Sequence, residues 1–328
     1  MRPGSFSSVL LVISLLLLGF YLLLGQHPDE ARTAMNGYPA KESAVLKPSF
    51  RQSIYSIAPY FSSLAEAPIK GEIRFVEITN EKSFYIYLPP NHAASDEHFP
   101  TLYHLHGAGV REKWVKHDIH WIATEHEKAV KMGVSVPMII VGPLDKSKFS
   151  MWADSKDGTN KMATLVTSDV RNYVETHYKA SQDRASRFIQ GFSMGGFGAA
   201  MLGLKYQDLY ATITILDGAM HDWRTLNLGR STIATNQFDD DEAYFKEWSP
   251  WEWVQRADLS QTPIFIIEGL MVDYNTRYFD YLKRHGARVR KVSPPCMHDV
   301  KCLEESYGVQ MFEFMNTHGN AVDSLVSN

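Results

Sequence analysis

The chain has 328 residues, of which 45% are hydrophobic and 21% are charged, and its formal net charge is −4. This length suits one large α/β domain, and the composition is that of an ordinary globular protein rather than of a disordered or fibrous one. The slightly acidic balance gives no electrostatic reason for nucleic-acid binding, so we expect no nucleic-acid partner.

An apolar run near the N-terminus predicts export. Arg2 precedes residues 9–24, and only Ser14 and Gly19 interrupt the apolar side chains there. The run is intermediate in length between a signal-peptide core and a membrane span, and no good cleavage site follows it. We therefore expect residues 1–25 to be a signal peptide or an N-terminal membrane anchor. The protein would then be periplasmic or secreted, with membrane contact through this segment alone.

Residues 26–70 carry little pattern and are predicted to be a linker or peripheral segment, whereas alternating strand and helix patterns fill residues 71–318. Strands are expected at residues 72–79, 83–88, 101–105, 137–141, 187–190, 211–216, 264–267 and 288–292. Helices are expected at 112–132, 164–180, 194–206, 275–285 and 299–316, followed by a tail at 319–328. This alternation predicts an α/β fold with a mostly parallel sheet and helices on both faces.

Residues 219–259 interrupt this alternation between the sixth and seventh strands. In such sheets, sites form beyond the carboxyl ends of the strands, so we predict that the insertion is a lid over a site. Its tryptophans, among them Trp223 and Trp251, are either packing residues or platforms for a sugar or an aromatic substrate. Trp152, outside the insertion, is a further candidate for lining the substrate site.

Gly191-Phe192-Ser193-Met194-Gly195 matches G-x-S-x-G, the turn that exposes a nucleophilic serine between a strand and a helix. A buried strand pattern precedes it and small residues follow it, which is the context that this motif requires. The turn leaves no room for side chains beside Ser193, which accounts for both glycines. Ser193 is therefore the candidate nucleophile.

A serine nucleophile needs a histidine base that a carboxylate orients, and α/β-hydrolases carry the three in the order Ser, acid, His. His298 follows the eighth predicted strand and is the candidate base. Asp273 follows the seventh strand and is the candidate acid. Asp217, which ends the sixth strand, is the alternative acid, whereas Glu268 comes too early to reach the histidine.

The oxyanion of the tetrahedral intermediate needs N–H donors. The backbone of Met194, directly after the serine, is one candidate. The loop His106-Gly107-Ala108-Gly109 follows the third strand and is close to the H-G-G-G pattern of esterases, so Gly107 or Ala108 is the other.

Cys296 and Cys302 are the only cysteines and flank His298. They form either a disulfide, which an oxidising compartment would favour, or two free buried thiols. His117 and His120 share one predicted helix with Glu127, but this spacing alone is weak evidence for a metal site. We expect no metal and no cofactor.

The chain is similar to the esterase D-like α/β-hydrolases, the group that includes the feruloyl esterases, over roughly residues 70–318. The residues that carry the resemblance are Tyr87-Leu88-Pro89-Pro90, Leu105-His106-Gly107, Trp152, Asp183-Arg184, Gly191-Phe192-Ser193-Met194-Gly195-Gly196 and His298-Asp299. It implies Ser193 as nucleophile, Asp273 as acid and His298 as base. The chain departs from the pattern at Phe192, where histidine is common, and at Asp217, where serine is frequent.

These features together predict an exported serine esterase that cleaves a small-molecule or carbohydrate-linked ester through an acyl-enzyme. Three alternatives stay open at this point: an acyltransferase of the same fold, a serine peptidase, and a non-catalytic binding protein on a hydrolase scaffold.

Overall fold

The structure is a computed structural model that describes residues 68–319. The predicted signal peptide or anchor at 1–25, nearly all of the predicted linker at 26–70 and most of the tail at 319–328 lie outside the described residues. Within 68–319, no helix combines the length and the apolar character needed to cross a membrane.

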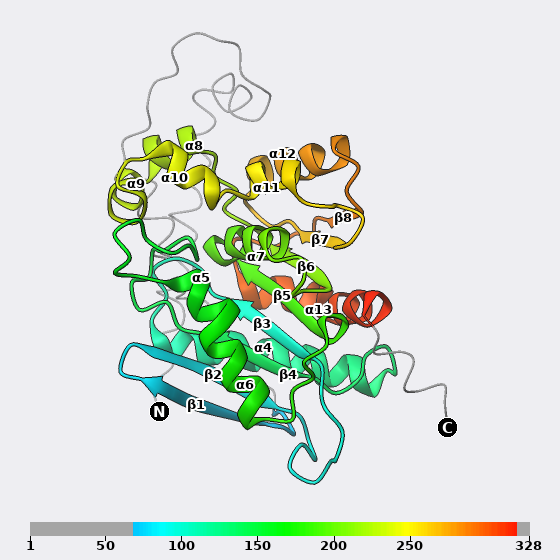
Figure 1. The fold of residues 1–328 in the computed structure, drawn as a ribbon. Coiled ribbons are helices and arrows are strands. Elements are labelled where there is room, and N and C mark those ends of the chain that lie inside the picture. Colours follow the sequence, from blue (N-terminus) through cyan, green and yellow to red (C-terminus); the bar gives the residue numbers. More distant parts are fainter. Residues whose placement is uncertain (1–67, 320–328) are drawn as a thin grey trace, which may run out of the picture. The chain divides into compact units, whose positions relative to one another are not determined.

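An eight-stranded sheet organises the described residues, with the strand order β1-β2-β4-β3-β5-β6-β7-β8 (Figure 1). The order places β5 centrally, between β3 and β6. β2 runs antiparallel to β1 and β4, and the pairs from β4 to β8 are parallel. The strands are β1 (Glu72–Thr79), β2 (Lys82–Leu88), β3 (Thr101–Leu105), β4 (Ile139–Pro143), β5 (Arg187–Phe192), β6 (Thr212–Leu216), β7 (Ile264–Ile267) and β8 (Val289–Val292). The predicted mostly parallel sheet is confirmed.

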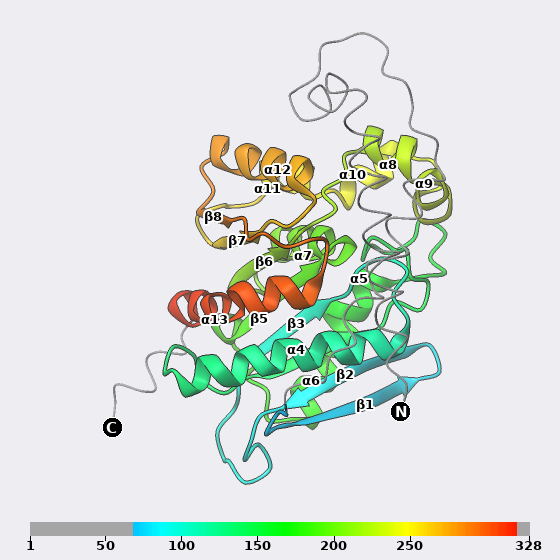
Figure 2. The same ribbon diagram turned by 180° about the vertical axis from the view of Figure 1, so that it is seen from behind.

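Helices cover both faces of the sheet. α4 (Glu112–Lys131) and α13 (Val300–His318) lie together on one face (Figure 2). The other face carries α5 (Met162–Thr164), α6 (Arg171–His177), α7 (Met194–Lys205) and α12 (Val272–Arg284). A π-helical turn at Leu165–Val170 joins α5 to α6. The predicted helix at 164–180 is therefore three short pieces, and α12 begins three residues before its predicted start.

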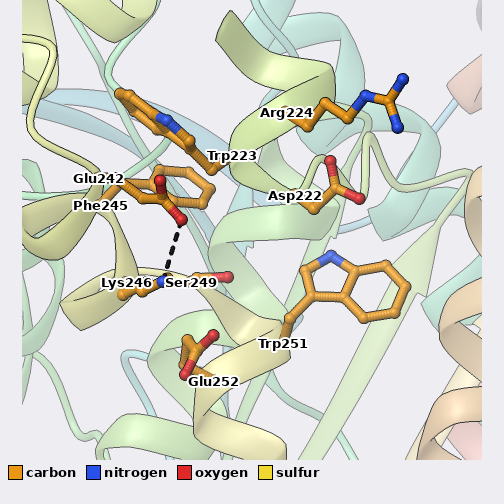
Figure 3. Close-up of a pocket in the computed structure, with 9 residues that line it drawn as sticks. All are labelled: Asp222, Trp223, Arg224, Glu242, Phe245, Lys246, Ser249, Trp251 and Glu252. Carbon is orange, nitrogen blue, oxygen red and sulfur yellow. Dashed lines mark ion pairs between the residues drawn. The ribbon is translucent and has the colours of Figure 1, made fainter.

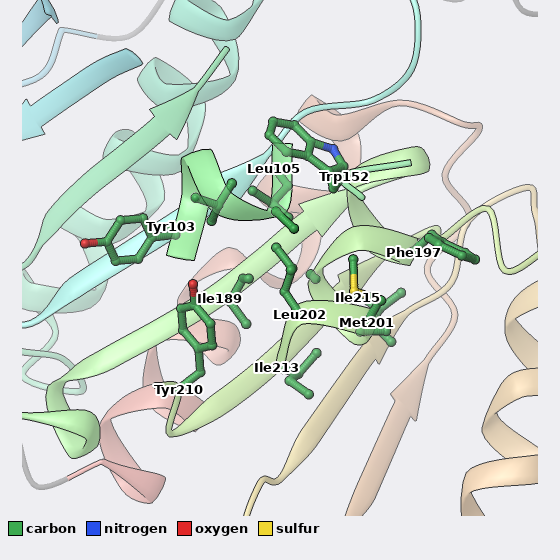
Figure 4. Close-up of a cluster of buried hydrophobic side chains, with 14 of the residues drawn as sticks. Tyr103, Leu105, Trp152, Ile189, Phe197, Met201, Leu202, Tyr210, Ile213 and Ile215 are labelled. Carbon is green, nitrogen blue, oxygen red and sulfur yellow. The ribbon is translucent and has the colours of Figure 1, made fainter. Parts of the chain in front are cut away.

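The core is divided into two apolar clusters by the sheet. β3, β5 and β6 present Tyr103, Ile189 and Ile213 to one of them, where they meet Leu202 of α7 (Figure 4). Central parallel strands are covered on both faces, which explains why their sequences show continuous apolar runs instead of alternation.

The 219–259 insertion folds as four short helices between β6 and β7: α8 (Trp223–Gly229), α9 (Ser231–Phe238), α10 (Glu242–Glu247) and α11 (Pro250–Arg256). Asp222 caps α8, and Asp241, the third residue of an acidic run, caps α10 by accepting from the N–H groups of Ala243 and Tyr244. A carboxylate at a helix N-terminus satisfies otherwise free N–H groups, which accounts for these two acids. That the insertion acts as a lid stays a prediction.

Candidate active site

Ser193 occupies the turn between β5 and α7 with a φ of 57°, a region that a residue with a side chain rarely adopts. The two motif glycines make this turn possible. A Cβ at Gly191 would lie 2.1 Å from the carbonyl oxygen of Gly195, and one at Gly195 would lie 1.8 Å from that of Leu105. The sequence therefore holds Ser193 in a strained turn at the end of a central strand.

The turn is fixed by hydrogen bonds to the end of β6. The Ser193 N–H donates to the Leu216 carbonyl at 3.0 Å, and the Ser193 carbonyl accepts from the Ala219 N–H at 2.9 Å. The segment after β6 and the serine turn are thus held as one unit, which brings Asp217 close to Ser193.

His298 lies in the loop between β8 and α13 and meets Ser193 there. Its Nε2 is 2.9 Å from the serine Oγ, and its ring packs on that of Phe192 with centroids 4.5 Å apart. Asp299, the next residue, caps α13 by accepting from the Cys302 N–H. The start of α13 therefore sets where the histidine lies.

The acid beside His298 is Asp217, and the preferred prediction of Asp273 is wrong. Oδ2 of Asp217 lies 2.6 Å from Nδ1 of His298. Asp273 instead lies in the first turn of α12, because that helix begins at Val272. The loop after β7 contributes N–H donors to Asp217 rather than an acid.

Asp217 is fully buried, and its second carboxylate oxygen is held by three donors. Oδ1 accepts from the N–H groups of Gly269 and Met271, both at 2.9 Å, and from Asn275 Nδ2 at 3.3 Å. A buried carboxylate is tolerated only when its oxygens are hydrogen-bonded in this way. Because Asp217 accepts at Oδ2 from Nδ1–H, the Nε2 atom of His298 is left to accept from the serine hydroxyl.

Asn275 is a functional candidate that the sequence analysis missed. It is fully buried on α12, and its Oδ1 accepts from the Gly218 N–H at 2.9 Å while Nδ2 donates to Asp217, Gly218 and Met271. The Asn275 side chain thus links the residues after β6, Asp217 and Gly218, to Met271 in the segment after β7. The only signal in the sequence is a polar residue among the first positions of a helix that follows a strand, which is common.

The loop after β3 passes close to the serine. A Cβ on Gly107 would lie 3.4 Å from the Ser193 Cβ. The ring of His106 orders this loop: Nε2 accepts from the Asp145 N–H, and Nδ1 donates to the Gly107 carbonyl at 2.8 Å. The carbonyl and N–H of a trans peptide point in opposite directions, so this bond also fixes the direction of the Ala108 N–H.

The His106 ring is fully buried, and burial lowers its pKa, which keeps it neutral with one donor and one acceptor nitrogen. Met194, the first residue of α7, directly follows Ser193. Its N–H belongs to the first turn of the helix, whose N–H groups have no intrahelical acceptor. Met194, Gly107 and Ala108 are therefore all placed at or beside the serine turn.

Trp152 does not line a substrate site, which corrects the prediction. Its side chain is fully buried, its indole N–H donates to the His106 carbonyl at 3.1 Å, and it fills the space beside Gly198 of α7. The residue thus supports the His106 loop from inside the core, where its polar N–H has a partner.

Trp223 and Trp251, the other two predicted substrate-lining residues, border a cavity of about 340 Å³ within the insertion (Figure 3). Ser193 and His298 are not among the residues that line this cavity. The two tryptophans therefore border a cavity within the insertion, and whether they contact the substrate of Ser193 stays a prediction.

Cys296 and Cys302 are joined in a disulfide, the first of the two alternatives that the sequence left open. The bond closes the loop that carries His298 onto the first turn of α13. Among residues 68–319, no group of three or more His, Cys, Asp and Glu side chains is arranged to hold a metal ion, and His117 and His120 lie on α4.

Comparison with known proteins extends these observations. The model of the family described as "Putative esterase" matches residues 76–278, a span that includes Ser193 and Asp217 and ends before His298. An esterase of Mycobacterium tuberculosis is 26% identical over 135 residues, which are 40% of this chain and 28% of that protein. An acetyl esterase of Caldicellulosiruptor saccharolyticus is 26% identical over 124 residues, which are 38% of this chain and 43% of that protein.

The chain thus spans less than half of the length of these two curated relatives. A solved structure of a ferulic acid esterase matches with a TM-score of 0.64 and 19% identity, over 77% of this chain and 100% of that one. This likeness confirms the predicted α/β-hydrolase fold.

Proposed function

Because the chain belongs to the esterase family, we propose that it is a serine hydrolase of carboxylic esters in which Ser193 is the nucleophile, His298 the base and Asp217 the acid. The observation that carries this proposal is the continuous set of hydrogen bonds from Ser193 Oγ through the two ring nitrogens of His298 to Asp217 Oδ2. This is the arrangement by which a neutral imidazole removes a serine proton.

In the proposed reaction, His298 Nε2 takes the Ser193 proton while Oγ attacks the ester carbonyl carbon. The tetrahedral intermediate then breaks its bond to the alcohol oxygen, and the alcohol leaves with the proton from Nε2. A water molecule attacks the resulting acyl-serine and gives its proton to Nε2. The bond to Oγ breaks, the acid leaves, and the proton returns to Ser193.

The negative charge on the intermediate is proposed to rest on the N–H of Met194 and on that of Ala108. Met194 lies at the N-terminus of α7, where the helix dipole favours negative charge. We favour Ala108 over Gly107 as the second donor, because the bond from His106 to the Gly107 carbonyl fixes the peptide that carries the Ala108 N–H.

We further propose that the protein acts outside the cytoplasm. The apolar run at residues 9–24 supports this as a signal peptide or an anchor. The pairing of Cys296 with Cys302 is consistent with it, because disulfides persist in oxidising compartments. Locating the full chain by fractionating cells, together with sequencing the N-terminus of the mature protein, tests both points.

The catalytic proposal is tested by labelling wild-type and Ser193→Ala protein with a fluorophosphonate and by measuring hydrolysis of short-chain p-nitrophenyl esters. We expect labelling and hydrolysis in the wild type only. Hydrolysis of these esters by a folded Ser193→Ala protein would refute the proposal. Absence of both in folded wild type would favour a non-catalytic binding protein, and product analysis with an added alcohol would reveal an acyltransferase.

A further inference from the structure

The cavity in the insertion is a candidate binding site that the proposed ester chemistry does not use. It lies between the start of α8 and the helices α10 and α11, and its volume of about 340 Å³ is that of a small-ligand site (Figure 3). All the residues that line it belong to the insertion. We therefore expect the cavity to bind a group other than the one that Ser193 attacks.

Aromatic side chains form much of the wall. Trp223 and Trp251 are half-buried, and Phe245 is fully buried and packs against Trp223 with centroids 5.5 Å apart. Trp251 also packs against Tyr278 and Tyr281 of α12, with ring centroids 5.0 and 5.2 Å away, and the Arg277 guanidinium lies 5.6 Å from its ring centroid. Rigid aromatic rings of this kind offer flat apolar surfaces for a ligand.

The polar groups of the wall include donors and acceptors that the protein itself leaves unused. The indole Nε1 of Trp251 is buried and has no hydrogen-bond partner, and within the described residues neither Arg224 nor Glu252 forms an ion pair. In Figure 3 the Nε1 edge of Trp251 is directed toward Asp222. A bound ligand that can both donate and accept hydrogen bonds would pair with Arg224 and Glu252.

The charges of the wall nearly cancel, which argues against a strongly charged ligand. Lys246 pairs with Glu242 at 2.9 Å, and Asp222 pairs with Arg277 of α12 at 3.2 Å. Among the described residues, Arg224 and Glu252 are the cation and the carboxylate of the wall that form no ion pair. A neutral polyol suits such a wall, because its hydroxyl groups can accept from Arg224 and donate to Glu252. Its C–H faces can pack against the tryptophans.

The cavity and the serine site are connected by neighbouring residues and by a shared helix. Asp222 follows the triad acid Asp217 by five residues, so their Cα atoms are at most roughly 18 Å apart. α12 contacts both sites: Asn275 donates to Asp217, and Arg277 pairs with Asp222. The segment 217–222 and α12 thus join the two sites, and an ester carried on an oligosaccharide of several units is the kind of substrate that would contact both.

We propose that the cavity bordered by Trp223 and Trp251 binds a neutral carbohydrate and positions the alcohol side of a sugar-linked ester for attack by Ser193. The catalytic part of this inference rests on the proposed function, whereas the binding part does not.

The test measures binding of xylotetraose and maltotetraose to the Ser193→Ala protein, which cannot consume an ester, by calorimetry. We expect Trp251→Ala in this background to weaken binding of the preferred tetrasaccharide about tenfold, because a stacking surface is lost. Glu252→Gln, which keeps the side-chain shape, should also weaken it. Trp253→Ala is the matched control, because Trp253 lies on the same helix but packs against Lys205 and donates to Glu247.

The inference is overturned if the folded Ser193→Ala protein binds neither tetrasaccharide, or if Trp253→Ala weakens binding as much as Trp251→Ala does. Tighter binding of a cationic glucosamine tetramer would also overturn it, by showing a cation site. Turnover of p-nitrophenyl acetate by the wild type tests the ester chemistry separately. In the wild type, the preference for an acetylated oligosaccharide over p-nitrophenyl acetate should fall with Trp251→Ala and stay unchanged with Trp253→Ala.

Discussion

Asp217 Oδ2 lies 2.6 Å from His298 Nδ1, although the two residues are 81 positions apart in the sequence. β6, which Asp217 follows, is hydrogen-bonded to β5, which Ser193 follows, and His298 in the loop after β8 contacts both residues. The acid is therefore delivered from the strand next to the nucleophile. The segment after β7 closes over the carboxylate with the N–H groups of Gly269 and Met271.

Substitutions at Asp217 and at Asp273 test which of the two carboxylates orients His298. We expect Asp217→Asn to lower kcat/KM between about a thousandfold and ten-thousandfold, because the amide cannot hold His298 in the required tautomer. Asp273→Asn should leave kcat/KM near the wild-type value. Steady-state hydrolysis of p-nitrophenyl acetate measures both, and the reverse ranking would contradict the structure.

The side-chain amide of Asn275 should affect both stability and catalysis, because it hydrogen-bonds Asp217. In Asn275→Ala, Oδ1 of Asp217 loses a donor and the buried Gly218 N–H loses its acceptor. We expect the free energy of unfolding to fall by about 2 kcal/mol and kcat to fall with little change in KM. Urea unfolding and steady-state kinetics measure the two effects.

The neighbouring Thr276 supplies the control for Asn275. Its hydroxyl bonds Glu268 and Lys291, away from the carboxylate of Asp217. Thr276→Val should therefore cost stability without the loss of kcat. Equal kcat values in the two variants would show that Asn275 is only structural.

The sequence predicted most of the fold because the relevant signals are local. The eight strands are apolar or alternating runs bounded by turn residues, and the observed bounds differ from the predicted ones by at most two residues. Ser193 and His298 could be chosen because a glycine-lined turn and the position after the last strand are both readable from the sequence. The match to the esterase family confirms the resemblance on which these choices also rested.

The choice of the acid could not be read in the same way. Asp217 and Asp273 both follow strands, and β6 and β7 are neighbours, with Leu216 opposite Ile267. Which carboxylate meets the histidine depends on where α12 begins and on the loop before it, which are not local signals. The prediction for Trp152 was wrong for a related reason. The burial of its side chain depends on a positive φ and on the space beside Gly198, a residue far away in the sequence.

The disulfide should stabilise the loop that carries His298. Cys296 and Cys302 are six positions apart, and closing so short a loop corresponds to about 2 kcal/mol of stability. We expect the Cys296→Ser/Cys302→Ser double variant to unfold at lower urea concentration and to have a lower kcat. Dithiothreitol should reproduce both effects in the wild type and should not affect the double variant. Unchanged stability and kcat on reduction would count against this role.

A buried carboxyl group should make stability depend on pH. Glu304 of α13 is fully buried, and burial, aided by the nearby Glu125, raises its pKa to about 8 from the ordinary value of 4.5. Between these two pH values the folded protein holds a proton that the unfolded chain has lost. The free energy of unfolding therefore falls as the pH rises through this window, and the loss is complete above the folded-state pKa.

Glu304→Gln removes the titrating group but keeps the shape and the contact with Gln190. Relative to the wild type, the variant should gain stability on the order of 4 kcal/mol between pH 5 and pH 9. Urea unfolding at both pH values measures this difference. Glu305→Gln is the control, because that side chain is 56% exposed and should show no such gain. A difference between Glu304→Gln and the wild type that stays constant with pH would mean that Glu304 ionises normally in the folded protein.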